Sequence, residues 1–263
     1  MRGNGGARHD EVTREEFARQ SGTMQVAKVF TDSDVISKIS AAVLRNGGRI
    51  SVLDIGCGPG ILTVALAPLV EEVVALDLTP EMIAKAKRRS GELGLTNVRF
   101  EVGRAEELPF ADGYFDVVVT RLILHHLLSP AKAVKEISRV LRAGGLAVVA
   151  DIVSSETQAE SELHNALEIL RDPSHVRALP EPELIALLNS AGLKVVAKDD
   201  WVNQREFGEW IKITNAPERE GPLLVVMRTL AEAGITAGIK LRVYGNRVKF
   251  DHRWVLATAE KIG

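Results

Sequence analysis

A glycine-rich segment carries the clearest chemical signal in this chain. Residues 52–60 read Val-Leu-Asp-Ile-Gly-Cys-Gly-Pro-Gly. Glycine tolerates positive φ and lets a ligand lie against the main chain, so Gly56, Gly58 and Gly60 predict a strand, a tight turn and a helix start around a bound nucleotide. Dinucleotide-binding turns space their glycines as G-x-G-x-x-G. The spacing G-x-G-x-G here, with Asp54 just before it, points away from NAD.

Candidate acid–base residues occur where later strands are expected to end. His125 and His126 follow the fourth apolar run, Asp151 ends the fifth, and His175 lies in an Asp-Pro-Ser-His turn that can fold back over the same face. We expect one histidine, His126 first, to act as a general base or to anchor a substrate, with Asp151 orienting it. The alternative is that the paired histidines only pack against or cap the strand end. No metal is expected, because the single cysteine lies in the glycine turn and no H-x-x-x-H spacing occurs.

Several segments, in order, resemble the class I S-adenosylmethionine-dependent methyltransferases. The glycine turn resembles their first motif, and Asp77 ends the following apolar run where the family binds ribose hydroxyls. Residues 102–110 resemble their adenine-contacting loop, and residues 115–121 and 141–146 their fourth strand and the turn before their fifth. The most similar group is that of ubiquinone and menaquinone biosynthesis, also called methyltransferase type 11. Residues 171–177 and the pair Phe207 and Trp210 also resemble one small-molecule branch of this group.

This resemblance implies S-adenosylmethionine as cofactor and S-adenosylhomocysteine as product. A protein that uses this cofactor must align a nucleophile behind the methyl group of the sulfonium. The expected cofactor contacts are Asp54, Gly56, Cys57, Gly58, Gly60, Asp77, Leu78, Met82, Arg104, Ala105, Glu106, Thr120 and Arg121, with Phe17 and Gln20 from an N-terminal lid.

Arg104 departs from the family pattern. The family has an acid at this position that accepts a hydrogen bond from the adenine amino group, and a guanidinium has no acceptor. Arg104 is expected to stack on adenine or to pair with Glu81 or Glu106. We expect adenine recognition to be altered rather than lost, with tighter cofactor binding after Arg104→Asp.

The alternation of apolar runs with helical stretches predicts an α/β fold, a Rossmann-like, doubly wound, mostly parallel sheet of seven strands with an antiparallel last strand. A capped helix start is expected at Thr79 and Pro80. The expected strands are 50–55, 73–77, 98–102, 115–120, 145–151, 193–197 and 248–260. The expected helices are 12–20, 31–45, 60–70, 80–91, 130–142, 155–170, 181–191, 207–219 and 223–233.

The chain divides into N-terminal helices over residues 1–46 and a methyltransferase domain over residues 47–263. Helical insertions at about 155–190 and 200–240 are expected to cover the active face. Apolar residues there are expected either to line the substrate pocket or to form the core of the cover. They are Leu163, Leu167, Leu170, Trp201, Phe207, Trp210, Ile211 and Met227.

Composition narrows the class of partner. The net charge of −2 over 263 residues gives no basis for nucleic-acid binding, which needs a basic patch. One cysteine fits a reducing compartment, and residues 1–6 lack the apolar core of a signal peptide. We therefore expect a cytoplasmic protein with no membrane span. The oligomeric state stays open.

Three functions remain open on the sequence. The first is methyl transfer to a carbon, oxygen or nitrogen nucleophile of a small, mostly apolar metabolite. The second is a protein that keeps the fold and cofactor but catalyses a cyclase-like reaction or only binds a ligand. The third is an NAD(P)-dependent oxidoreductase.

Overall fold

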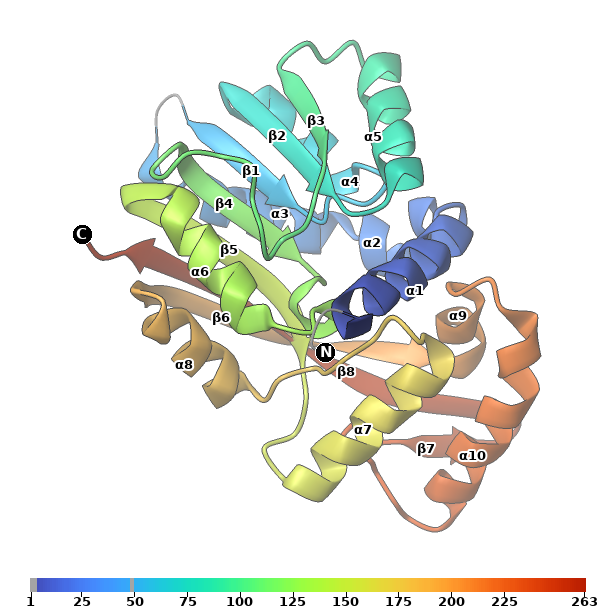
Figure 1. Ribbon diagram of the computed structural model, residues 1–263. Helices are drawn as coiled ribbons and strands as arrows, with labels where there is room; N and C mark the ends of the chain where they lie inside the picture. Colours follow the sequence, from blue (N-terminus) through green and yellow to red (C-terminus); the bar gives the residue numbers. More distant parts are fainter. Residues whose placement is uncertain (1–3, 48–49) are drawn as a thin grey trace.

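The computed structural model describes residues 4–47 and 50–263. Residues 1–3 of the polar N-terminal stretch and residues 48–49 at the start of the expected domain lie outside this description. A single sheet runs through the molecule in the order β3-β2-β1-β4-β5-β8-β6, with β7 paired to β8 (Figure 1). The strands are β1 Ser51–Ile55, β2 Glu72–Asp77, β3 Val98–Val102, β4 Phe115–Arg121, β5 Leu141–Val153, β6 Leu193–Glu206, β7 Arg242–Tyr244 and β8 Arg247–Lys261.

The first five strands are parallel, and β8 enters antiparallel between β5 and β6. This confirms the mostly parallel sheet with an antiparallel last strand. The strand order reverses between β1 and β4, so the connections that follow these two neighbouring strands leave in opposite directions at their carboxyl ends. Open α/β sheets bind ligands at such a point.

Helices cover both faces of the sheet. They are α1 Asn4–Gln20, α2 Lys28–Thr31, α3 Ser33–Val43, α4 Ile61–Leu66, α5 Pro80–Glu92, α6 Pro130–Val140, α7 Gln158–Arg171, α8 Glu181–Ser190, α9 Phe207–Lys212 and α10 Glu220–Glu232. Short 3-10 helices are η1 Thr23–Gln25, η2 Leu44–Asn46, η3 Ala67–Leu69, η4 Leu124–His126 and η5 Pro217–Arg219. No helix in the described part of the chain is both long and apolar enough to span a bilayer.

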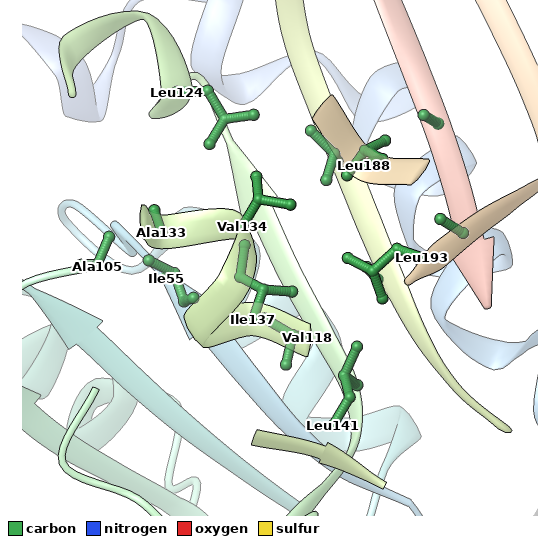
Figure 2. Close-up of a cluster of buried hydrophobic side chains, with 14 of the residues drawn as sticks. Ile55, Ala105, Val118, Leu124, Ala133, Val134, Ile137, Leu141, Leu188 and Leu193 are labelled. Carbon is green, nitrogen blue, oxygen red and sulfur yellow. The ribbon is translucent and has the colours of Figure 1, made fainter. Parts of the chain in front are cut away.

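Alternation along the strands divides the core between the two faces. Leu53 and its neighbours on one face pack against α6 and α8, in the cluster of buried side chains that Figure 2 shows. Val52 and the residues in register with it pack on the other face against α3 and α4. Because both faces are buried, these strands read as continuous apolar runs.

A third core lies beyond the end of the parallel sheet. The amino-terminal part of β8 and the carboxyl-terminal part of β6 extend past β5 and carry α7, α9, α10 and β7 (Figure 1). Leu167, Trp210, Met227 and Phe250 come from four of these elements and are buried together. This extension contains the segments expected to cover the active face and is called the cover from here on.

Four sequence expectations need correction. The sheet has eight strands rather than seven, because residues 242–244 form a hairpin with β8. Residues 200–206 continue β6, so the second helical insertion begins at Phe207 and not at residue 200. Helix α1 begins at Asn4 rather than at Val12. The side chain of Thr79 makes no capping bond, and the Met82 N–H donates to the Thr79 carbonyl instead.

Candidate active site

The glycine turn follows β1 and is fixed to the neighbouring strand. The backbone N–H groups of Gly56 and Cys57 donate to the Leu76 carbonyl of β2 at 2.7 and 3.0 Å. Gly56 has φ 69°, and a Cβ there would lie 2.0 Å from Cδ1 of Ile123. Gly58 has φ 53° with nothing within 4 Å of an added Cβ, so this backbone faces open space. The turn therefore presents bare main chain to a cleft.

Two buried carboxylates hold this turn. Asp77 Oδ2 accepts the Gly58 N–H and Oδ1 accepts the Thr79 N–H, both at 2.8 Å. Asp54 Oδ2 accepts the Thr63 hydroxyl at 2.6 Å. Burial raises the pKa of each carboxyl to about 6 against these opposing bonds. Both groups would gain from a ligand that donates hydrogen bonds or carries positive charge.

Arg121 ends β4 and faces the same carboxylates. Its guanidinium donates to the Val29 carbonyl at 2.7 Å, while its Nε has no partner in the described part of the chain. Burial lowers the Arg121 pKa to about 10, and Asp54 partly offsets this effect. The orphaned donor marks a second polar contact point for a ligand.

The glycine turn opens into a cleft of about 1050 Å³, part of it open to solvent. Its lining joins the turn to residues of α1, η4 and the cover. The predicted site residues that line it are Phe17, Gln20, Asp54, Gly56, Cys57, Gly58, Asp77, Met82, Arg121, His125, His126 and His175.

A second hollow adjoins Asp77 on the side of the residue 102–110 loop. It is lined by the predicted residues Leu78, Arg104, Ala105 and Glu106. Arg104 forms ion pairs with Asp10 of α1 and, at 3.6 Å, with Glu106. The expected alternative pairing with Glu81 is not formed. Helix α1 thus places the Asp10 carboxylate beside Arg104 in this hollow.

Helix α1, the segment expected to form a lid, contributes residues to the lining of both hollows. Gln20 donates to Asp172 Oδ2 at 2.7 Å, and His9 Nε2 contacts the His126 carbonyl at 2.8 Å. Glu16 Oε1 forms an ion pair with Arg219 Nη2 at 2.7 Å. These contacts join the lid to η4, to the turn after α7 and to η5 of the cover.

The histidines divide into one oriented by an acid and two without one. His125 Nδ1 lies 2.5 Å from Asp151 Oδ1. The Asp151 carboxylate is itself fixed by the N–H groups of Leu124 and Ile152 at 2.9 and 2.8 Å. Burial lowers the His125 pKa, but Asp151 outweighs it and the net pKa lies above the ordinary value. The expected orienting role of Asp151 therefore falls on His125 rather than on His126.

The environment of His126 and His175 lowers their pKa values and favours the neutral imidazole. His126 Nδ1 lies 3.0 Å from the Ser174 carbonyl, and His175 Nε2 lies 2.8 Å from Asn165 Oδ1. Burial, reinforced by His125, lowers the pKa of His126 to about 4 and that of His175 still further. Both rings lie close to His125, with centroids at 4.2 and 5.3 Å.

Some expected residues lie behind the cleft instead of lining it. Gly60, Thr120 and Asp151 are outside the lining, and Asp151 acts through His125. Of the eight apolar cover residues, Trp210 lines the cleft, whereas Leu167, Phe207, Ile211 and Met227 belong to the core of the cover. Of the two alternatives expected for these residues, the pocket wall holds for Trp210 and the core of the cover holds for the other four named here.

Other lining residues give no isolated sequence signal. Asp10 lies on a polar helix far from any motif, and Asp172, Arg205 and His252 reach the cleft only through the cover. Glu168 follows His164 by four residues on α7, a spacing that places both on one helix face. A search for paired histidines at that spacing misses it, because the second residue is a glutamate.

Comparisons with known proteins agree with this geometry. Residues 53–149 match the family model described as a methyltransferase domain. The uncharacterized methyltransferase YcgJ of Bacillus subtilis is 34% identical over 237 residues, covering 89% of this chain and 93% of the relative. Its crystal structure superposes with a TM-score of 0.80 at 30% identity, covering 88% of this chain and 99% of YcgJ.

Two further structures extend the comparison. A putative methyltransferase from Bacillus halodurans has a TM-score of 0.82 at 29% identity, covering 88% of this chain and all of that one. The [4+2]-cyclase SpnF shares the fold alone, with a TM-score of 0.63 at 20% identity over 88% of this chain and 81% of SpnF. From the extent of the match to YcgJ, together with the glycine turn and its two carboxylates, the chain belongs to the class I S-adenosylmethionine-dependent methyltransferases.

Proposed function

We propose that this protein transfers a methyl group from S-adenosylmethionine to a carbon, oxygen or nitrogen nucleophile of a small, mostly apolar metabolite. The observation that carries the proposal is that one cleft joins the glycine turn, with Asp54 and Asp77, to the His125 ring held by Asp151. When bound, the cofactor supplies an electrophilic methyl group on a sulfonium. The residues of the chain must bind it, hold the acceptor in line and remove a proton where the acceptor carries one.

The glycine turn and its two carboxylates, Asp54 and Asp77, form a cradle whose chemistry suits this cofactor. A Cβ at Gly58 would project into open space beside the turn, so the bare backbone is accessible to a ligand. Asp77 retains acceptor capacity for ribose hydroxyls beyond its two backbone bonds. Asp54 provides a buried carboxylate for the ammonium of the aminoacid end. Their raised pKa values show that burial leaves both charges short of compensation.

For adenine, we propose that Asp10 replaces the missing acid at position 104. Arg104 has no acceptor, but its ion-pair partner Asp10 lines the same hollow together with Leu78 and Ala105. A carboxylate from α1 can accept the adenine amino group, and this contact would couple closure of the lid to cofactor binding.

His125 is the base that this geometry favours. Asp151 fixes its orientation and, by accepting at Nδ1, leaves Nε2 as the basic atom. A pKa above the ordinary value makes that atom a stronger base than His126, whose pKa is about 4. An acceptor proton would pass to Nε2 as the nucleophile forms.

The test separates cofactor binding from transfer. Isothermal titration with S-adenosylhomocysteine measures the first, and release of S-adenosylhomocysteine across a panel of phenols, amines and carbon acids measures the second. His125→Asn is expected to keep cofactor affinity and to lower transfer by about 10²–10⁴-fold. Conversion of an acceptor with no S-adenosylhomocysteine released would favour the cyclase-like alternative. Undetectable cofactor binding would overturn the proposal.

A further inference from the structure

A group of three buried polar side chains lies at the cover end of the cleft, away from the glycine turn. His164 and Glu168 lie one turn apart on α7, and His252 comes from the extended part of β8. They are 1%, 3% and 4% exposed, respectively. One potential ligand atom from each lies within 4.8 Å of the others.

Four polar atoms of this group have no hydrogen-bond partner in the described part of the chain. Both ring nitrogens of His164, Oε1 of Glu168 and Nε2 of His252 are unpaired among the residues that the structure describes. His252 Nε2 lies 2.9 Å from Glu168 Oε1, yet the two do not meet in hydrogen-bond geometry. Buried polar atoms are nearly always paired, so several orphans around one point indicate a missing partner.

We propose that His164, Glu168 and His252 bind one divalent transition-metal ion, zinc or an ion of similar ligand preference. Two imidazole nitrogens and one carboxylate oxygen are a common three-residue ligand set for Zn²⁺ and for Fe²⁺. Hard oxygen-preferring ions such as Mg²⁺ do not favour this set.

The spacing of the donor atoms suits a single small ion. Ligands bound to tetrahedral zinc at about 2.0–2.1 Å lie about 3.3 Å from one another. Glu168 Oε1 lies 2.9 Å from His252 Nε2 and 3.8 Å from His164 Nε2, which brackets that value. Glu168 Oε2 is taken by Arg171 at 3.1 Å, a bond that turns Oε1 toward the histidines.

One coordination position of the ion would face the cleft and stay open to a substrate; the part of the cleft next to the ion is called the chamber. Glu168 and His252 line the cleft, whereas His164 lies behind it. Three protein ligands with one open position are typical of metal sites that bind a substrate rather than of structural sites. Arg171 and Arg205 line the same chamber and favour an anionic oxygen over a neutral group.

This arrangement refines the acceptor class, and that part rests on the proposed methyl transfer. The ion and the two arginines would hold an acidic hydroxyl or a carboxylate of the acceptor. The acceptor would thereby be anchored at the cover end of the cleft that also contains His125.

Metal binding is tested on the untagged full-length protein after chelator treatment and dialysis. We expect one Zn²⁺ per chain by elemental analysis, and a Co²⁺ form with the intense visible absorption of a tetrahedral site that Zn²⁺ abolishes. Acetohydroxamate, a small oxygen ligand, should change the Co²⁺ spectrum if a coordination position is open. Absence of stoichiometric Zn²⁺ and Co²⁺ binding would overturn the site, and an unchanged Co²⁺ spectrum would overturn the open position.

Variants then locate the ion. Glu168→Gln and His252→Gln should each weaken Zn²⁺ binding at least about 100-fold, because losing a ligand exceeds the 10–100-fold effect of losing an outer partner. The control is Glu162→Gln, an exposed carboxylate on the same helix, which should keep the wild-type affinity. His164→Gln repeats the test should either variant fail to fold by circular dichroism. Equal Zn²⁺ affinity in folded ligand variants and control would refute the assignment.

Titration with S-adenosylhomocysteine on the same preparations separates the two proposals. Binding of S-adenosylhomocysteine without Zn²⁺ binding would overturn the metal site and leave the methyltransferase proposal standing. Zn²⁺ binding without S-adenosylhomocysteine binding would overturn the methyltransferase proposal and leave the metal site standing. It would also remove the proposed role of the ion in anchoring the acceptor.

Discussion

Asp77→Asn is the substitution that best separates a ligand-binding carboxylate from a structural one. The change keeps the shape of the side chain and removes its charge. Asp77 binds the N–H groups of Gly58 and Thr79, so it has a structural part to lose as well as a proposed ribose contact. Loss of the structural contacts changes the stability of the ligand-free protein, whereas loss of the ribose contact changes cofactor affinity. The size of each effect follows from the structure.

The stability of the ligand-free protein should change little. Burial raises the Asp77 pKa from 3.8 to about 6, so ionisation at neutral pH costs the folded state about 3 kcal/mol, which asparagine recovers. The amide nitrogen must face one of the two N–H groups, and losing that charge-assisted bond costs about 1.5–3 kcal/mol. These opposing effects leave the free energy of unfolding within about 2 kcal/mol of wild type.

Cofactor affinity should fall much more. Each ribose hydroxyl that donates to a charged acceptor contributes about 1.5–3 kcal/mol, so loss of one such bond weakens S-adenosylhomocysteine binding about 10- to 150-fold. Calorimetry measures the affinity and urea denaturation the stability. Asp116→Asn is the matched control, since Asp116 also accepts a backbone N–H, from Ser51 at 2.8 Å, at the opposite end of the sheet. An Asp77→Asn affinity within threefold of the control would refute the ribose assignment.

Three further predictions concern charge in the site. In an NMR titration, the His125 pKa should lie above its ordinary value and should fall in Asp151→Asn, because the carboxylate outweighs burial; an unchanged pKa would mean that Asp151 does not act on this ring. Asp54 and Asp77 hold protons in the folded state between about pH 4 and 6 that the unfolded chain releases, so the ligand-free protein should lose stability as pH rises through that window. S-adenosylhomocysteine should therefore raise the Tm more at about pH 7.5 than at about pH 5, and the opposite order in differential scanning fluorimetry would contradict the raised pKa values. Asp10→Asn should weaken S-adenosylhomocysteine binding at least about tenfold in calorimetry if its carboxylate accepts the adenine amino group, whereas unchanged affinity would refute the proposed contact between Asp10 and adenine.

The parallel half of the fold could be predicted from the sequence because its signals are local. Each buried strand reads as an apolar run, and the turn at Gly56 needs positive φ, so type and position follow from a few neighbouring residues. The length of β6 could not be predicted in the same way. Residues 200–206 alternate in burial and are stabilised by pairing with residues 249–255, which no local pattern reveals.

The cofactor half and the cover half of the site also differ in whether their contacts are local in sequence. Asp54 and Asp77, the proposed cofactor ligands, lie at the carboxyl ends of β1 and β2. Their hydrogen-bond partners Gly58, Thr63 and Thr79 lie in the glycine turn or only a few residues away. Asp10 meets Arg104 across 94 positions of sequence, and Glu168 meets His252 across 84, through packing of α1 and of the cover. Propensity and spacing carry no information about such contacts, so neither of these two pairings was expected.

This difference bears on how substrate choice is separated from cofactor binding. The cradle around Gly58 depends on β1, β2 and the turn between β1 and α4, all within the parallel sheet. The chamber at Glu168 and His252 depends on α7, α9 and the part of β8 beyond β5, which form a core of their own. Substitutions in the core of the cover can move Arg171, Arg205 or His252 without straining the glycine turn. Acceptor specificity should therefore respond to changes in the cover while affinity for S-adenosylhomocysteine stays constant, and parallel measurement of the two in Trp210→Phe would show whether the cores act independently.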